Sequence, residues 1–90
     1  MTKGKYIYRE LHTRDGEREY YHKGLEVFPE EKTVEEVEKY LDEFCSEFWG
    51  ETDGEERSGE YWFFGEIITR VNGWEFITEE EYNVLKKFMV

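Results

Sequence analysis

Residues 33–50 read TVEEVEKYLDEFCSEFWG and contain the most regular pattern in the chain. Thr33, followed three residues later by Glu36, matches a capping box, which satisfies free N–H groups at the start of a helix. Gly50 stands where a helix commonly ends. Between them, apolar residues recur every three or four positions and form one stripe: Val34, Val37, Leu41, Phe44 and Phe48. The pattern predicts an amphipathic helix over residues 33–49.

The segment before this helix predicts a β-hairpin over residues 5–28. Strand-favouring aromatic and aliphatic residues flank Asp15-Gly16, a dipeptide typical of two-residue turns. Pro29 is expected to end the second strand, because proline cannot donate to a strand ladder. A turn at Asp15-Gly16 sets a register in which opposite charges face each other twice: the pairs are Leu11–Tyr20, His12–Glu19 and Arg14–Glu17.

The segment after the helix predicts a loop and a second hairpin. Residues 50–59 contain no apolar side chain and are expected to form an acidic, solvated loop. Residues 60–78 are rich in strand formers, and Asn72-Gly73 is a strong turn signal within them. Gly65 is expected at a bulge or a close packing contact. The Asn72-Gly73 turn would set the pairs Val71–Trp74, Thr69–Phe76 and Ile68–Ile77.

A second helix is predicted over residues 79–89. Thr78 and Glu81 match another capping box, and Tyr82, Leu85 and Met89 follow on one side. The predicted order is therefore ββαββα in one α+β domain spanning residues 1–90. Strands that feed helices in this way favour an antiparallel sheet of about four strands with both helices packed on one face. Aromatic residues make up 19% of the chain and supply bulk for a small core.

Negative charge is concentrated around the first helix. Residues 30–56 contain 12 carboxylates and two lysines, for a net charge of −10, whereas the whole chain has a net charge of −11. On a helical wheel the acids lie away from the apolar stripe, and like charges at this spacing repel one another. A protein that needed only solubility would interleave lysines, so the segregation favours docking on a positively charged partner. The expected partner-binding residues are Glu35, Glu38, Asp42, Glu43, Glu47, Asp53, Glu55 and Glu56.

The charge also limits the kind of partner. Nucleic acid and anionic lipid would be repelled, so a basic protein surface is the expected partner. The sharper hypothesis is a nucleic-acid mimic that inhibits a nuclease or another nucleic-acid-binding protein. In size and charge, although in no particular motif, the chain is similar to small anti-CRISPR and anti-restriction inhibitors.

The residues that most often carry chemistry do not form a recognisable site. His12 and His22 are expected on opposite faces of the first hairpin, and Cys45 lies among carboxylates that discourage a thiolate. No enzymatic activity, metal or cofactor is therefore expected. The single cysteine and the lack of a signal-like or membrane-spanning apolar run favour a cytoplasmic protein.

The aromatic second hairpin supports an alternative function. Helices on one face of the sheet would leave its other face partly exposed, and exposed aromatic residues often anchor protein interfaces. In this alternative the chain is a protein-interaction or homodimerisation module, and its acidity only aids solubility. The expected interface residues are Trp62, Phe64, Ile68 and Ile77.

Overall fold

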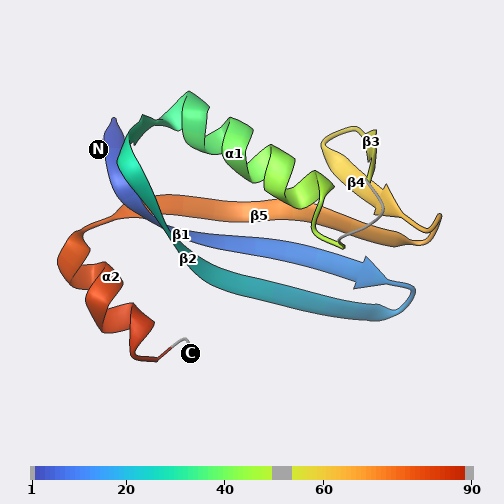
Figure 1. Ribbon diagram of the computed structural model, residues 1–90. Coiled ribbons are helices and arrows are strands. Elements are labelled where there is room, and N and C mark those ends of the chain that lie inside the picture. Colours follow the sequence, from blue (N-terminus) through green and yellow to red (C-terminus); the bar gives the residue numbers. More distant parts are fainter. Residues whose placement is uncertain (1, 50–53, 89–90) are drawn as a thin grey trace.

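The computed structural model describes residues 2–49 and 54–88 and shows an α+β fold (Figure 1). Its elements are β1 (Lys3–Asp15), β2 (Arg18–Thr33), α1 (Val34–Ser46), β3 (Glu55–Arg57), β4 (Glu60–Phe63), β5 (Ile67–Ile77) and α2 (Glu79–Lys86). All neighbouring strands are antiparallel, and the strand order is β2-β1-β5-β4-β3. The sheet thus has five strands where about four were expected.

The first hairpin forms, but its register differs from the prediction. Asp15 pairs with Arg18, so the two-residue loop is Gly16-Glu17, and Gly16 has a positive φ of 64°. The predicted pairs are each displaced by two residues. Because side chains alternate with a period of two, this shift leaves every residue on its predicted face. The pairs become Leu11–His22, His12–Tyr21 and Arg14–Glu19.

Pro29 was expected to end the second strand, but β2 continues to Thr33. Two features make this possible. β2 is an edge strand, and its pairing with β1 shifts between Gly4 and Tyr6. Proline is tolerated at sheet edges and irregularities, where its missing N–H leaves no ladder bond unmade. The irregular stretch also leaves Phe28 buried beneath α1.

The expected turn at Asn72-Gly73 is absent, because β5 runs straight through it from Ile67 to Ile77. The chain reverses instead at Phe64-Gly65, whose φ angles are 56° and 80°. Gly65 therefore occupies a turn and not a bulge within a strand. The pairs predicted from the Asn72-Gly73 turn are consequently wrong: Val71–Trp74, Thr69–Phe76 and Ile68–Ile77.

Asn72 is instead the extra residue of a bulge in β5. Glu10 faces Gly73 and Leu11 faces Val71, so Asn72 has no opposite residue on β1. Its side chain donates a hydrogen bond to the Glu10 carboxylate. The Asn-Gly signal thus marks an irregularity of the backbone, but long-range pairing of β5 with β1 decides that the strand continues.

The predicted acidic loop contains a short strand. β3 pairs with β4 through a turn at Ser58 and Gly59, whose φ angles are 52° and 82°. Two consecutive positive φ angles are typical of a type I′ hairpin turn. The strand was missed because β3 is a polar edge strand without the apolar alternation that indicates strands. Residues 50–53 of the predicted loop lie outside the described residues.

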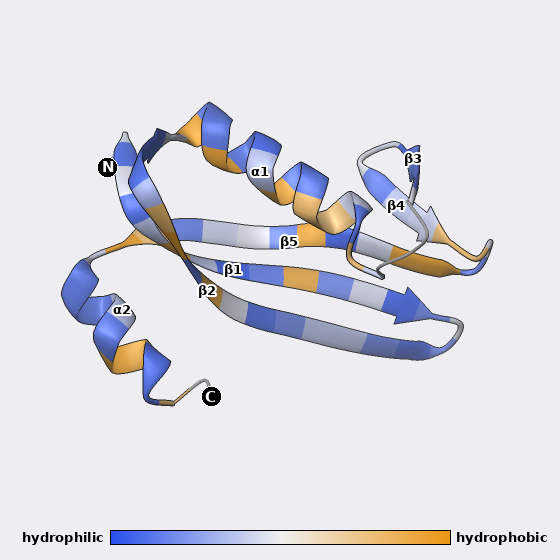
Figure 2. Cartoon of the chain, in the orientation of Figure 1, coloured by the Kyte–Doolittle hydropathy of each residue, from blue (hydrophilic) through white to orange (hydrophobic). Residues whose placement is uncertain are grey.

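The first helix lies across one face of the sheet and covers the core. The predicted capping box is present, with Thr33 accepting from the Glu36 N–H at 3.2 Å. The helix ends at Ser46, earlier than predicted, and Gly50 lies outside the described residues. Figure 2 shows apolar and polar positions alternating along α1. Its apolar stripe and the sheet form two core clusters. The first contains Ile7, Phe28, Val37 and Leu41, and the second contains Leu11, Cys45, Tyr61 and Phe63.

The second helix packs on the opposite face, so the expectation of both helices on one face is wrong. Its capping box at Thr78 and Glu81 is present, and the Tyr82 ring lies 5.0 Å from that of Tyr6. Tyr6 and Ile7 are consecutive strand residues and point to opposite faces, and Ile7 faces α1. α2 buries none of its residues fully. A short apolar stripe does not specify which face it will cover.

Candidate functional site

The predicted acidic residues of α1 are exposed but do not form a single row. α1 contains five acids and one lysine, and Glu47 forms its C-cap. Glu38 and Asp42 line one flank, towards β5 and the turn between β3 and β4. Glu43 lines the other flank, towards β2. The helix thus presents two acidic edges with different surroundings, and Glu35 is exposed in its first turn.

The flank of Glu38 and Asp42 borders a groove of about 570 Å³, here called the acidic groove. Val71 and Trp74 of β5 contribute half-buried apolar surface, and the Trp74 ring packs against Phe76 at 5.0 Å. The groove therefore combines two carboxylates with an aromatic surface. Its full lining is Glu38, Lys39, Leu41, Asp42, Gly59, Val71, Gly73 and Trp74.

Asp42 influences two buried groups beside the groove. Burial raises the pKa of Tyr61, and the neighbouring Asp42 carboxylate raises it further. Burial raises the pKa of the Cys45 thiol to about 12, with Asp42 as the second cause. Both groups therefore stay uncharged near neutral pH.

The opposite flank of α1 is less suited to a cationic partner. Glu36 and Glu43 line a pocket of about 290 Å³ together with Lys32, Lys39, Phe28 and Tyr40. The two lysines balance the two acids there. Glu36 is also engaged by the capping box, since the Thr33 N–H donates to its carboxylate at 3.0 Å, and this backbone hydrogen bond lowers its pKa. The acidic groove thus carries the stronger uncompensated charge.

The predicted acids of the following segment are divided between the two faces of the sheet. Glu56 pairs with Tyr61 and so lies on the face of α1, where it accepts from the Gly59 N–H at 3.1 Å. Glu55 lies on the opposite face and forms two hydrogen bonds with Arg57, at 3.2 and 3.1 Å. Glu55 is therefore neutralised and removed from the acidic surface. Asp53 lies outside the described residues.

The four predicted alternative interface residues differ in exposure, although Trp62 and Ile68 face each other across β4 and β5. Ile68 and Ile77 are 9% and 5% exposed and lie near opposite ends of β5. Trp62 is half-buried, with the Arg57 guanidinium 4.6 Å above its ring. Phe64 is 63% exposed because it occupies the turn before β5. Only Phe64 of this set is freely available to a partner.

The histidines lie on opposite faces of the first hairpin, as predicted. His12 pairs with Tyr21, and His22 pairs with Leu11. His22 lies beneath α1 and contacts the Thr13 hydroxyl at 2.9 Å, and burial lowers its pKa. Within residues 2–49 and 54–88, no three His, Cys, Asp or Glu side chains are grouped to hold a metal ion.

A partly buried chain of polar side chains connects Trp49, just after α1, to the sheet. The Trp49 indole N–H donates to the Thr69 hydroxyl at 2.9 Å, and the Thr13 and Thr69 hydroxyls are 2.9 Å apart. Thr13 also contacts His22. Sequence reasoning missed this chain because it depends on β1 pairing with β5, and no local signal encodes that pairing.

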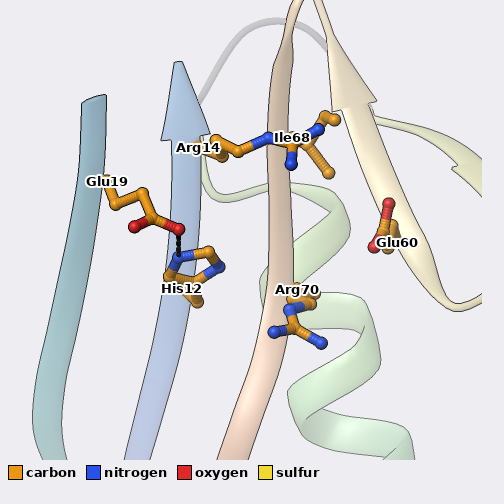
Figure 3. A pocket seen from close by; sticks show the side chains of 6 residues that line it. All are labelled: His12, Arg14, Glu19, Glu60, Ile68 and Arg70. Atoms are coloured by element: carbon orange, nitrogen blue, oxygen red, sulfur yellow. Dashed lines mark hydrogen bonds and ion pairs between the residues drawn. The ribbon is translucent and has the colours of Figure 1, made fainter. Parts of the chain in front are cut away.

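A third, more polar hollow lies on the face that α1 leaves open (Figure 3). It measures about 240 Å³ and is here called the arginine pocket. Its cationic side chains, Arg14 and Arg70, come from β1 and β5. His12, Glu19, Glu60 and Ile68 complete the lining.

Comparison with known proteins does not extend these observations. The chain matches no protein-family model, no curated protein and no solved structure. Among the described residues, neither helix combines the length and apolar character needed to cross a membrane. The geometry of these pockets is therefore the basis for any functional proposal.

Proposed function

We propose that this chain is a non-enzymatic protein-binding protein whose acidic groove docks on a basic surface of another protein. The observation that supports the proposal is the placement of exposed Glu38 and Asp42 beside Trp74 and Val71. None of the ion pairs among the described residues involves an α1 carboxylate. Glu38 and Asp42 therefore have no ion-pair partner there and are available to another protein.

The groove suits a lysine or arginine side chain. The aliphatic stem of such a residue would pack on the half-buried Val71, because long cationic side chains bury their stems on apolar surface. The charged head would contact the Trp74 ring, where a cation–π contact contributes about 0.5–1 kcal/mol at an exposed site. Glu38 and Asp42 would accept charge-assisted hydrogen bonds from the same head group.

The sharper proposal is a nucleic-acid mimic that inhibits a nuclease or another nucleic-acid-binding protein. α1 has 13 residues, so its length is about 20 Å, which corresponds to roughly six base pairs of a duplex. Carboxylates spread over this length can occupy a groove that normally holds phosphates. A cytoplasmic location belongs to the same proposal, because the single cysteine, Cys45, is a buried free thiol.

A defined probe tests the docking surface. We expect an arginine-rich peptide to bind in a salt-sensitive manner, and the double variant Glu38→Gln/Asp42→Asn to weaken binding at least tenfold. Glu79→Gln/Glu80→Gln is a matched control, because it removes the same charge from exposed positions on α2. Equal weakening by both double variants would show that only net charge matters and would contradict a defined groove.

A competition experiment tests mimicry. The wild type and the groove variant are used as bait for nucleic-acid-binding proteins, which are then challenged with duplex DNA or RNA. Mimicry predicts that a partner held by the wild type is lost from the groove variant and is displaced by nucleic acid. A partner that binds nucleic acid and this protein at the same time would contradict the sharper proposal while leaving protein binding intact.

Self-association is a second candidate, supported by apolar side chains on the open face. Tyr21 and Val27 are 58% and 50% exposed there, and Val84 of α2 is 54% exposed. These residues differ from the predicted alternative interface, since Ile68 and Ile77 are buried in the monomer. Sedimentation over a range of concentrations separates the candidates. A dimer that Val84→Asp dissociates would favour self-association, and a monomer at all concentrations would exclude it.

A further inference from the structure

The strand pairing brings two arginines to one pocket on the open face. Arg14 faces Ile68 and His12 faces Arg70 across the β1–β5 pair, so the two arginines are diagonal neighbours. Their side chains border the same hollow, and Figure 3 shows Arg14 reaching across to Ile68, with Arg70 further along β5. Diagonal Cα positions in a sheet are roughly 7–8 Å apart, a distance that long side chains can span. One ligand can therefore contact both guanidinium groups.

Both arginines lie near carboxylates but pair with neither. Glu19 faces Arg14 on β2, yet its carboxylate contacts His12 Nε2 at 3.2 Å. Glu60 lines the far side of the pocket. Within the described part of the chain, Arg14 and Arg70 form no ion pair and no side-chain hydrogen bond. The five N–H donors of each guanidinium therefore have no side-chain acceptor among the described residues, although Glu19 and Glu60 line the same pocket.

We propose that the arginine pocket binds a small oxyanion, a phosphate or a carboxylate, between Arg14 and Arg70. Guanidinium groups match the paired oxygens of these anions and bind them through two parallel hydrogen bonds. The pocket volume of about 240 Å³ is below the roughly 300–1,000 Å³ of pockets for drug-sized ligands, so a single small group fits best. This site is independent of the acidic groove and of the function proposed for it.

The net charge of −11 does not prevent such binding. The acids of α1 lie across the sheet from the pocket, and at physiological salt exposed charges are screened beyond roughly 8 Å. Glu60 is the carboxylate that faces the pocket without its own partner, so it should oppose the anion directly. This opposition provides a test in which a substitution strengthens binding.

The experiment is an NMR titration with inorganic phosphate at constant ionic strength, followed by a parallel titration with acetate. We expect saturable shifts of the Arg14 and Arg70 side-chain N–H signals and of the Ile68 amide. Arg70→Gln should weaken binding roughly ten- to hundredfold, and Arg70→Lys should fall between this variant and the wild type because it keeps charge but loses the forked geometry. Glu60→Gln should tighten binding severalfold.

Arg57→Gln is the matched control, because Arg57 lies on the same face but is engaged with Glu55 outside the pocket. It should leave phosphate affinity unchanged, and the amide spectrum of each variant checks its fold. Saturation by either anion supports the site and identifies the geometry it prefers. Chemical shifts that do not saturate would overturn the proposal. So would a phosphate affinity that Arg57→Gln and Arg70→Gln weaken equally, or that Glu60→Gln weakens.

Discussion

Alanine substitutions at two glycines distinguish two ways of folding the second half of the chain. Gly65 has a φ of 80° in the turn between β4 and β5, whereas Gly73 lies within β5 and is not among the glycines with positive φ. An added Cβ meets no heavy atom within 4 Å at either position. The two substitutions are therefore matched in packing and differ in the backbone conformation that alanine must adopt.

The expected difference can be worked out from this geometry. Alanine reduces the entropy of the unfolded chain by the same amount at both positions, an effect of about 0.4–1 kcal/mol. Only Gly65→Ala also forces an L residue into the left-handed region, which costs about 1–2 kcal/mol. We therefore expect the free energy of unfolding of Gly65→Ala to be about 1–2 kcal/mol below that of Gly73→Ala. For a domain of this size the difference corresponds to about 4–16 °C in Tm.

Thermal and urea unfolding, followed by far-UV circular dichroism, measure this difference. Gly73→Ala should be as stable as the wild type or slightly more stable. If Gly73→Ala is instead the less stable variant, the chain reverses at Asn72-Gly73 as local turn chemistry predicts. That result would refute the pairing of β1 with β5 along its whole length, and with it the arginine pocket.

Three further predictions concern the core and its titratable groups. Leu41→Ala should lower the free energy of unfolding by about 2–5 kcal/mol, because Leu41 is 1% exposed. Val84→Ala should change it by less than about 0.5 kcal/mol, because Val84 is 54% exposed. Similar urea midpoints for the two variants would contradict the placement of the helices. Cys45, with a pKa of about 12, should react with a thiol reagent at pH 8 only as fast as the protein unfolds, and rapid labelling of the native protein would be inconsistent with its burial. The pKa of His22 is lowered in the folded protein, so near and below about pH 6.5 the unfolded chain binds more protons at this site than the folded one. The free energy of unfolding should therefore fall as the pH drops from about 7 to 5. His22→Gln should flatten this decrease, and an unchanged slope would exclude His22 as its cause.

Local signals in the sequence predicted the helices well. Both capping boxes are formed by the residues that the pattern indicated, because a cap is made within four consecutive residues. The stripe of α1 was equally informative, since Val37 and Leu41 are fully buried in the core. In each case the residues that specify the structure are close together in the chain.

Errors arose where distant segments decide the structure. Asn72-Gly73 is a strong local turn signal, but pairing of β5 with β1 keeps the strand continuous and absorbs Asn72 in a bulge. Phe64, an unfavourable residue at positive φ, occupies the actual turn. The face covered by α2 was likewise undetermined, because its stripe can pack on either side of a sheet. Propensity alone could not rank these outcomes.

The candidate site was also predictable only where local signals specify it. The exposed acids of α1 were predictable from the helical pattern, but their separation into two flanks was not. Which flank forms a groove depends on Trp74 and Val71, and these residues reach it only through the central position of β5. The arginine pocket was missed entirely, because Arg14 and Arg70 are far apart in the sequence and become neighbours only in the sheet.

Carboxylates of the strands and carboxylates of α1 differ in their ion pairing, and core packing explains why the acidic segment is tolerated. Four strand carboxylates have a basic side chain beside them: Glu26 with Arg9, Glu10 with Lys23, Glu19 with His12, and Glu55 with Arg57. On α1 the acids have no ion-pair partner among the described residues, although like charges one helical turn apart repel by a few tenths of a kcal/mol per pair. The core contacts of Val37 and Leu41 are worth several kcal/mol and outweigh this repulsion. Core packing can therefore hold an unneutralised acidic helix in place without help from counter-charges, which leaves its carboxylates free for a partner.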